Sequence, residues 1–326
     1  MNNSFGNRFR IEIYGGSHTE SLGVIITGVP CGIALTESDF MADIDRRRSG
    51  AKGTTPRREV DVPHIISGTE HGVTTGESLE IRFYNENTRS GDYDRLRNHP
   101  RPSHADLTAR HKYGEQFDLR GGGIFSGRMT LLLVAAGVVA KKILAQTHFE
   151  SRITELGGCR DSMQFEAVVA AAQRDGDSVG GVFECTVTGA GRDLGEPFFD
   201  SVESIAAHLL FAVPAVKGVE FGSGFEGVKL RGSERNDRII SAEGATATNH
   251  EGGINGGITN GNPIVVRVAI KPTPSIAQAQ DTYNFVTDSV EPLTIGGRHD
   301  ACIVLRASVV VEAVMAIALA ELKLSL

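Results

Sequence analysis

Cysteine pairs and excess basic charge are missing from this sequence of 326 residues, and each absence excludes a class of protein. The four cysteines lie far apart without a C-x-x-C pair, so neither a structural zinc site nor a disulfide framework is predicted. Lysine and arginine number 33 against 40 aspartate and glutamate, a net charge of −7. This balance argues against general nucleic-acid binding, so an anionic ligand would have to meet a local basic pocket.

Long hydrophobic segments are missing as well. The longest run of apolar or small residues, Leu131–Ala140, is about half of the roughly 20 residues that a membrane-spanning helix needs. The N-terminus carries no apolar signal core, so we expect a cytoplasmic protein without a membrane partner. With 40% hydrophobic and 22% charged residues, the composition is that of an ordinary globular protein with enough chain to bury a core.

Periodicity predicts several strands and helices. β-branched runs bounded by turn residues predict strands at Val24–Ile26, Leu79–Phe83, Val182–Val187 and Ile264–Ile270. A capping-box pattern at Thr36–Asp39 opens a short helix that runs toward Arg48. Apolar patterns predict further helices over Ser126–Gln146, Val202–Val213 and Ala307–Leu324. Because the last of these is apolar almost to its end, we expect it to pack in a core or an interface.

Two parts of the chain resemble each other. Gly72–Arg82 lines up with Gly257–Arg267, and Leu22–Gly28 resembles Gly180–Gly189. Two related halves, with strands between long buried helices, predict an α+β fold of one domain over residues 1–326. In that fold two similar sheet layers enclose the helices, in contrast to a doubly wound parallel sheet. Chance similarity of short turn–strand segments is the alternative explanation of the repeat.

Two histidines stand in polar segments that fit proton transfer. Gly15-Gly16-Ser17-His18 follows a strand-like run, so His18 is a candidate proton donor with Ser17 as its relay. A turn histidine satisfied by the backbone is the alternative. In Arg101–Asp106, His104 lies between a proline-fixed turn and a carboxylate that could hold one tautomer. A surface Asp-His pair fits this segment equally well.

Glycine loops and arginines form the remaining clusters. Asp45–Arg48 with Lys52, Arg57 and Arg58 suits phosphate or carboxylate recognition, or else a solvated helix end. Arg120–Arg128 is a glycine loop that opens the predicted long helix, where free N–H groups favour an anion. The last cluster is Lys271–Ser275 with Arg298-His299-Asp300, whose aspartate could instead cap a helix. Together these clusters predict an anion-handling enzyme that uses acid-base chemistry on a planar or phosphorylated ligand.

Taken in order, the segments resemble chorismate synthase over essentially the whole chain. The matching motifs are Phe5-Gly6, Phe9-Arg10, Gly16–His18, Asp45–Arg48, Thr54–Glu59, Arg101–Asp106, Lys112–Gly114, Arg120–Gly123, Gly218–Gly222, Gly252–Ile254, Gly256–Ile258, Lys271–Ser275 and Gly297–Cys302. The resemblance implies a β-α-β sandwich of two antiparallel sheets and a homotetramer. It also implies a lyase that ends the shikimate pathway, in aromatic amino acid biosynthesis. The reaction is the 1,4-anti elimination of phosphate from 5-enolpyruvylshikimate 3-phosphate, which gives chorismate with reduced FMN and no net redox change.

The resemblance further implies roles for individual residues. His18 would protonate or steady the reduced flavin, His104 would protonate the departing phosphate, and Asp300 would tune the flavin nitrogen that receives the substrate proton. Two serines match positions near these proton routes, Ser17 and Ser126. The substrate-binding positions carry over to Arg47, Arg48 and Arg128. The FMN-binding positions carry over to Ser126, Ala215, Gly256, Lys271, Pro272, Thr273, Pro274, Ser275 and Arg298.

The sequence departs from the family inside two motifs. Gly16 and Thr19 flank Ser17-His18 where the family usually has Glu and Gly. In the glycine loop, Ile124, Phe125 and Met129 stand where Arg, Ser and Glu are usual. An isoleucine cannot replace the charge-assisted hydrogen bonds of an arginine, each worth about 1.5–3 kcal/mol.

These departures leave two other functions open. One is a weakened or inactive relative that binds flavin or substrate without turnover, and the other is a phosphate-eliminating enzyme with a different ligand in the flavin site. The source of reduced flavin is open as well, since NADPH, a separate flavin reductase or low-oxygen conditions would all serve. Because no reductase domain is visible, we expect the monofunctional type.

Overall fold

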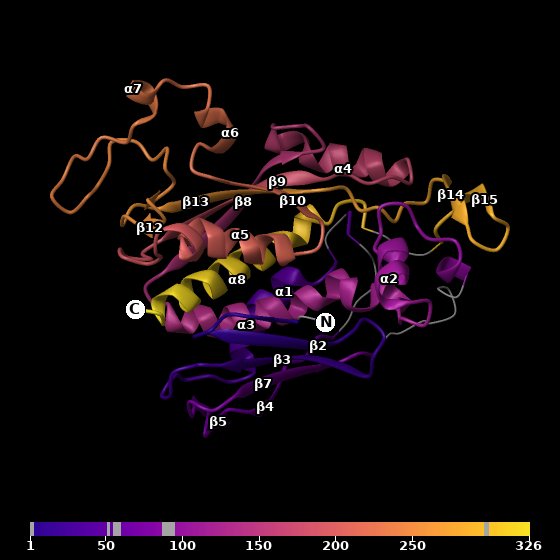
Figure 1. Cartoon of the computed structure of the whole chain (residues 1–326), viewed down its shortest axis with the longest axis horizontal. Helices are drawn as coiled ribbons and strands as arrows, with labels where there is room; N and C mark the ends of the chain where they lie inside the picture. Colours follow the sequence, from indigo (N-terminus) through magenta and orange to yellow (C-terminus); the bar gives the residue numbers. More distant parts are fainter. Residues whose placement is uncertain (1–2, 51–52, 55–59, 87–94, 297–299) are drawn as a thin grey trace.

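Two antiparallel sheets face each other across a layer of helices (Figure 1). The computed structural model describes residues 3–50, 53–54, 60–86, 95–296 and 300–326. The first sheet has the order β1 (Ser4–Phe5), β2 (Arg10–Gly15), β3 (Ser21–Thr27), β7 (Leu79–Tyr84) and β4 (His64–Ser67). The second has the order β10 (Val216–Phe221), β13 (Ile264–Ile270), β9 (Gly181–Thr188) and β8 (His148–Leu156). The α+β sandwich that the sequence and its resemblance imply is therefore confirmed.

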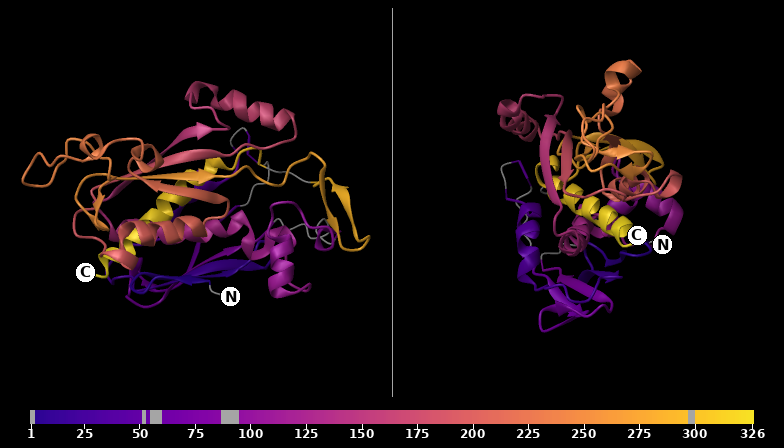
Figure 2. Two further views of the ribbon diagram at one scale, coloured as in Figure 1. Left: turned by 45° about the horizontal axis from the view of Figure 1, so that its top comes forward. Right: turned by 90° about the vertical axis from the view of Figure 1, so that its left-hand side faces the viewer.

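The helices and short ribbons occupy distinct places around this sandwich. The helices between the sheets are α1 (Ser38–Arg47), α3 (Thr130–Ile143), α5 (Val202–Ala212) and α8 (Val304–Lys323). Outside that layer lie α2 (Asp106–Tyr113), α4 (Phe165–Arg174), α6 (Gly224–Gly227) and α7 (Gly232–Arg235), as Figure 2 shows. Small two-stranded ribbons pair β5 (Thr69–Glu70) with β6 (Val73–Thr74), β11 (Ile254–Asn255) with β12 (Ile258–Thr259), and β14 (Gln280–Asn284) with β15 (Ser289–Leu293). The 3-10 turns are η2 (Arg95–Arg97), η3 (Arg120–Phe125), η4 (Gly127–Met129), η5 (Ser162–Gln164) and η6 (Phe198–Asp200).

Burial of the strands and helices explains why they pack in this order. Buried and partly exposed residues alternate along β7 and β13, as expected for strands with one face on a core. The helices α3 and α8 are buried on nearly every side because they fill the space between the sheets. They cross closely at Gly137, where a Cβ atom would lie 2.4 Å from Cβ of Ala313.

The internal repeat appears in the topology. The series β2-β3-α1-β4-β7-α3 recurs as β8-β9-α5-β10-β13-α8, and the paired strands follow the order β2-β3-β7-β4 in one sheet and β8-β9-β13-β10 in the other. Gly28 and Gly189 each follow the second strand with a positive φ. A Cβ atom there would collide with the carbonyl of Arg8 or Gln146, two positions before the first strand in each half. Glycine is required at the same point of both halves.

The predicted strands lie inside β3, β7, β9 and β13, whereas the boundaries of the long helix were wrong. Ser126 has an extended backbone and caps the turn η4, so α3 begins only at Thr130. The glycine loop therefore does not open α3. The alternative interpretation, in which Asp300 caps a helix, is wrong, because α8 begins at Val304 with Ile303 as its N-cap.

The last helix is buried as expected, and it carries two buried carboxylates. Glu312, 1% exposed, accepts two hydrogen bonds of 2.7 Å from Arg46 and lies 3.6 Å from Lys141. Glu321 accepts backbone N–H groups from Asn7, Arg8 and Phe9 at 2.8, 2.9 and 2.6 Å. No helix within the described ranges is long and apolar enough to cross a membrane.

We expect Glu321→Gln to lower the free energy of unfolding by about 1–3 kcal/mol, because the amide leaves buried backbone donors unsatisfied. Urea denaturation measures the change, and hydrogen exchange should rise first at residues 7–9. Glu226→Gln is the matched control, since Glu226 is exposed and pairs only with Lys229 in the described part of the chain. Equal effects of the two substitutions would contradict the structural role of Glu321.

Candidate active site

The first histidine segment packs against the glycine loop. Ser17 and His18 follow β2, and the backbone N–H of Ser17 donates to the carbonyl of Gly123 at 3.2 Å. A Cβ atom at Gly121 would lie 2.6 Å from Cε1 of His18 and 2.7 Å from Oγ of Ser17. Gly121, Gly122 and Gly123 all have positive φ, of 61°, 85° and 53°. Only glycine adopts this run without strain, and here it brings the loop against the histidine.

A buried ion-pair network lies beside this loop. Asp61, 5% exposed, accepts a 2.8 Å hydrogen bond from Nη1 of Arg128 and lies 3.6 Å from Nη1 of Arg47. Arg47 also donates from Nε to the Thr130 hydroxyl at 3.0 Å and from Nη2 to the Gly127 carbonyl at 3.1 Å. Burial lowers the pKa of Arg47 to about 9, although the Asp61 carboxylate acts to raise it. Arg47 therefore still carries a positive charge at neutral pH.

One guanidinium nitrogen of Arg128 makes no hydrogen bond to the described residues. Its Nε donates to Asn85 at 2.6 Å and its Nη1 to Asp61, whereas its buried Nη2 has no hydrogen-bond partner among the described residues. The other end of Asn85 donates to the carbonyls of Gly16 and Thr19 at 3.1 and 2.7 Å. A buried cationic donor without a partner is costly, so this nitrogen fits an anionic ligand.

Three charged or polar residues of this region escaped the sequence analysis, Asp61, Asn85 and Arg306. Asn85 directly follows β7, whose last residue Tyr84 pairs with Ser21 beside the histidine segment, but no motif marks it. Arg306 lies in the first turns of α8 and donates from Nη2 to Asp300 at 2.6 Å. No motif marks Arg306 either. Arg306, Arg128 and Asp300 all contribute to the pKa of Arg47, so their charges lie in the same region.

The second histidine lies in another part of the site. Nε2 of His104, in the turn before α2, is 2.7 Å from the hydroxyl of the buried Ser275, which follows β13. Lys271 donates from Nζ to the carbonyl of Ser103 at 2.9 Å, and its backbone N–H donates to Ala215 at 3.0 Å. Burial lowers the pKa of Lys271, and the charge of Lys217 lowers it further. The structure thus joins the His104 segment to Lys271–Ser275.

The carboxylate predicted to orient His104 has another partner. Asp106 accepts two 2.7 Å hydrogen bonds from the guanidinium of Arg101, and both side chains are buried. Burial acts to raise the pKa of Asp106, but the hydrogen bonds and charge of Arg101 outweigh it and hold that pKa below its usual value. The pair fixes the turn that carries His104, and its two side chains also line a small pocket beside α2 and η3.

The segment Lys271–Ser275 is anchored from a third direction. The hydroxyl of Ser178 donates to the carbonyl of Thr273 at 2.6 Å, and the next residue, Val179, donates its N–H to Ala301 at 2.9 Å. Ala301 directly follows Asp300, so the segment that carries Asp300 lies next to the residues that follow β13. Pro272 and Pro274 lie in the same described segment.

Some predicted site residues lie elsewhere. The turn of Gly256 joins β11 to β12 near the start of α5, where the carbonyl of Gly257 accepts the N–H of Val202 at 2.9 Å. Lys271 lies past the opposite end of β13, a strand that spans about 23 Å.

Arg48 hydrogen-bonds to Asp45 and to the Val60 carbonyl, and its buried Nε has no hydrogen-bond partner in the described ranges. Arg298 lies outside the described residues.

Each residue that departs from the family motifs is accommodated. The hydroxyl of Thr19 accepts from the Gly16 N–H at 2.8 Å and donates to the carbonyl of Ser21 at 2.7 Å. Ile124 packs against the main core and Met129 is 4% exposed within it. Phe125 contacts the rings of Tyr113 and Phe117. Apolar packing of Ile124, Phe125 and Met129 therefore helps to hold the glycine loop.

The donor set can be tested against FMN, the cofactor that the resemblance implies. A phosphorylated, planar flavin needs a backbone that approaches closely and a cation with a free donor. Gly121–Gly123 supply the first. Lys271 supplies the second, since its ammonium has three donors and gives one of them to the Ser103 carbonyl. The residues present therefore fit a flavin or another planar anion. Among the described residues no group of three or more His, Cys, Asp or Glu could hold a metal ion.

Comparisons with known proteins identify the family of this chain. The family model of chorismate synthase matches residues 9–324. A chorismate synthase of Chitinophaga pinensis is 55% identical over 324 residues, covering 99% of this chain and 96% of the relative, and one of Dehalococcoides mccartyi is 44% identical, covering 99% and 97%. A crystal structure of chorismate synthase superposes with a TM-score of 0.77 at 27% identity, covering 98% of this chain and 93% of that one. The chain belongs to the chorismate synthase family, the lyases that form chorismate in the shikimate pathway.

Proposed function

We propose that the clusters around His18, His104 and Asp300 form one active site, in which this chain eliminates phosphate from 5-enolpyruvylshikimate 3-phosphate with reduced FMN. The observation that carries the proposal is the buried network of Arg47, Asp61 and Arg128. In this network Nη2 of Arg128 has no hydrogen-bond partner among the described residues. Two guanidinium groups share one carboxylate there, so the network keeps a net positive charge for an anionic substrate.

The substrate anions would bind to Arg47, Arg48 and Arg128. The Thr130 hydroxyl orients Arg47, and Asp61 orients Arg128. Because both guanidinium groups are held before the substrate arrives, less side-chain entropy is lost on binding. Arg48 follows Arg47 at the end of α1, where its Nε, which has no hydrogen-bond partner within the described part of the chain, adds a donor. The buried arginines would also exclude water from the reacting carbons.

His104 is the proposed proton donor to the departing phosphate. Its Nε2 contacts the Ser275 hydroxyl, so the serine fixes the ring and the proton route. Lys271 holds the same turn through the Ser103 carbonyl, and its ammonium adds positive charge near the leaving group.

His18, Ser17 and Asp300 would handle the protons beside the cofactor. Reduced FMN, when bound, lends electron density to the substrate and takes it back, which leaves no net oxidation. Ser126 with the glycine loop, Ala215 and the segment Lys271, Pro272, Thr273, Pro274 and Ser275 would hold it, together with Arg298. Asp300 keeps its carboxylate oriented through Arg306, so it can accept a hydrogen bond or a proton at that site.

We also propose the homotetramer. Gly256 lies too far from Lys271 to join this site within one chain, so its proposed flavin contact requires another subunit. Large apolar side chains that remain exposed support a partner surface, namely Phe198, Phe199, Phe211, Phe225 and Val228.

The four free cysteines fit a reducing compartment, and we propose the cytoplasm. A separate flavin reductase or NADPH would keep the flavin reduced.

An anaerobic assay tests the function directly. The full chain is mixed with chemically reduced FMN and 5-enolpyruvylshikimate 3-phosphate, and chorismate and phosphate are followed together. Equimolar products are expected, and oxidised FMN under the same conditions should give none. Absence of turnover by a folded protein that still binds FMN would instead support an inactive relative.

A further inference from the structure

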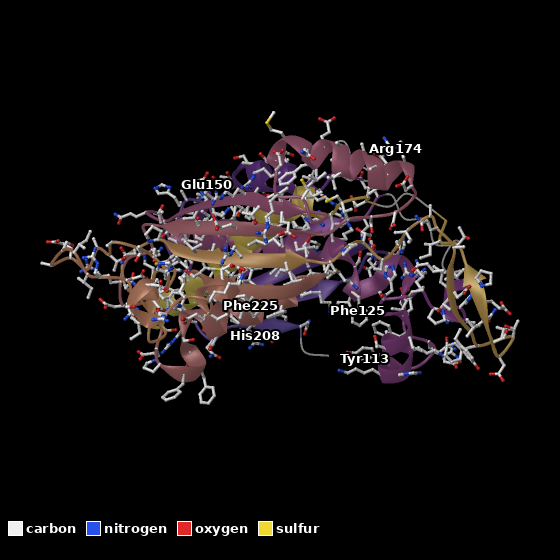
Figure 3. All side chains as sticks on the ribbon, turned by 90° about the horizontal axis from the view of Figure 1, so that it is seen from above. Tyr113, Phe125, Glu150, Arg174, His208 and Phe225 are labelled. Carbon is white, nitrogen blue, oxygen red and sulfur yellow. The ribbon has the colours of Figure 1, made fainter. Side chains whose placement is uncertain are left out.

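An aromatic cluster joins the two histidine-bearing parts of the site. Tyr113 and Phe117 are stacked with ring centroids 4.8 Å apart, and Phe125 lies 6.4 Å from Tyr113 and 6.1 Å from Phe117. Tyr113 and Phe125 are labelled close together in Figure 3, far from Phe225 on α6. All three distances fall within the range at which aromatic rings attract one another.

The rings come from two segments of the chain, Tyr113 and Phe117 from the end of α2 and the turn after it, and Phe125 from the end of η3. Tyr113 is the last residue of α2, whose first turn directly follows His104. Phe125 ends η3, which contains the three glycines, and two of these, Gly121 and Gly123, contact the Ser17-His18 segment. If one segment moves, either the other segment moves with it or the contacts between these rings are broken.

The glycine loop needs such an anchor. Its backbone hydrogen bonds join Gly122 to Leu119, Ser126 to Gly123, and Ser17 to Gly123. Two of these bonds lie within the loop, and the third joins the loop to the His18 segment. The ring of Phe125 adds a contact between the loop and Tyr113 of α2. Three consecutive glycines have high conformational entropy when unfolded, so their left-handed geometry persists only when neighbouring contacts hold it.

We propose that Tyr113, Phe117 and Phe125 form an aromatic latch that fixes the glycine loop to α2 and so sets His18 relative to His104. Phe125 is a positioning residue, because it acts through the loop and through α2. This inference rests on the proposed function, since it assigns both histidines to one reaction. It also explains how a phenylalanine can stand in the loop where the family has a serine.

The test compares Phe125→Ala with Phe125→Tyr in the full ligand-free chain by hydrogen exchange. Without the ring, exchange should rise about tenfold both in residues 120–126 and in the last turn of α2. Phe125→Tyr should stay near the starting protein because it keeps the ring. Met163→Ala removes an exposed apolar side chain on η5 and should leave both segments unchanged.

FMN titration gives a second readout, in which Phe125→Ala should weaken binding about tenfold and Phe125→Tyr should restore it. Unchanged exchange, or a rise confined to residues 120–126, would overturn the latch. Exchange is measured without substrate, so this result does not depend on turnover. If the starting protein forms no chorismate but the two segments still loosen together, the proposed function fails while the mechanical coupling stands.

Discussion

His104→Ala should lower the turnover number by about 10²–10⁴ while leaving FMN affinity nearly unchanged, because a positioned proton donor contributes that much. Its Nε2 is held by Ser275, so the ring is fixed before the substrate arrives. The measurement is the anaerobic formation of chorismate and phosphate under saturating reduced FMN, with a separate FMN titration.

His111→Ala is the matched control for this substitution. His111 lies on the same helix α2 and is exposed, so its removal should change neither turnover nor folding. If His104→Ala turned over as fast as the starting protein, the leaving phosphate would need another proton donor. A loss of FMN affinity equal to the loss of turnover would move His104 to the flavin site.

Asp61→Asn should lower the free energy of unfolding by about 3–5 kcal/mol, because it leaves buried guanidinium groups without their shared carboxylate. Arg128 would lose its 2.8 Å ion pair and Arg47 its 3.6 Å neighbour. Asparagine suits this position because Asp61 has a φ of 47°, a conformation that asparagine tolerates. Guanidinium denaturation measures the loss.

Glu12→Gln serves as the control for Asp61→Asn. Glu12 lies 3.8 Å from Arg10, and both side chains are 48% exposed, so the loss of this pair should cost less than about 1 kcal/mol. Substrate affinity should fall in Asp61→Asn and stay constant in Glu12→Gln. A stability loss in Asp61→Asn no larger than in the control would show that Asp61 does not compensate the two arginines.

The apolar patterns of the sequence were enough to predict the strands in β3, β7, β9 and β13 and the burial of α8. Each depends on residues close in the chain, whose alternation or continuous apolarity reports how many faces are covered. The long helix was predicted to begin too early, at Ser126, because an extended serine that caps a 3-10 turn has the same local composition as a helix start.

Motifs placed His18, His104, Arg47 and Asp300 among the candidates from the sequence alone, because their residue types and neighbours are local. Their partners are not local. Asp61 lies 67 positions from Arg128, and Ser275 lies 171 positions from His104. Asn85 and Arg306 carry no motif at all and enter the site only through contacts.

The sequence by itself therefore determined the family, four of the strands and the long buried helices, and the residue types available for chemistry. Only the tertiary structure decided which arginines share Asp61, that Asp106 pairs with Arg101, and that Gly256 stands apart from Lys271. The physical reason is that ion pairs and hydrogen bonds between distant residues depend on how the two sheets pack across the helix layer. That packing is a property of the whole chain, and no local pattern encodes it.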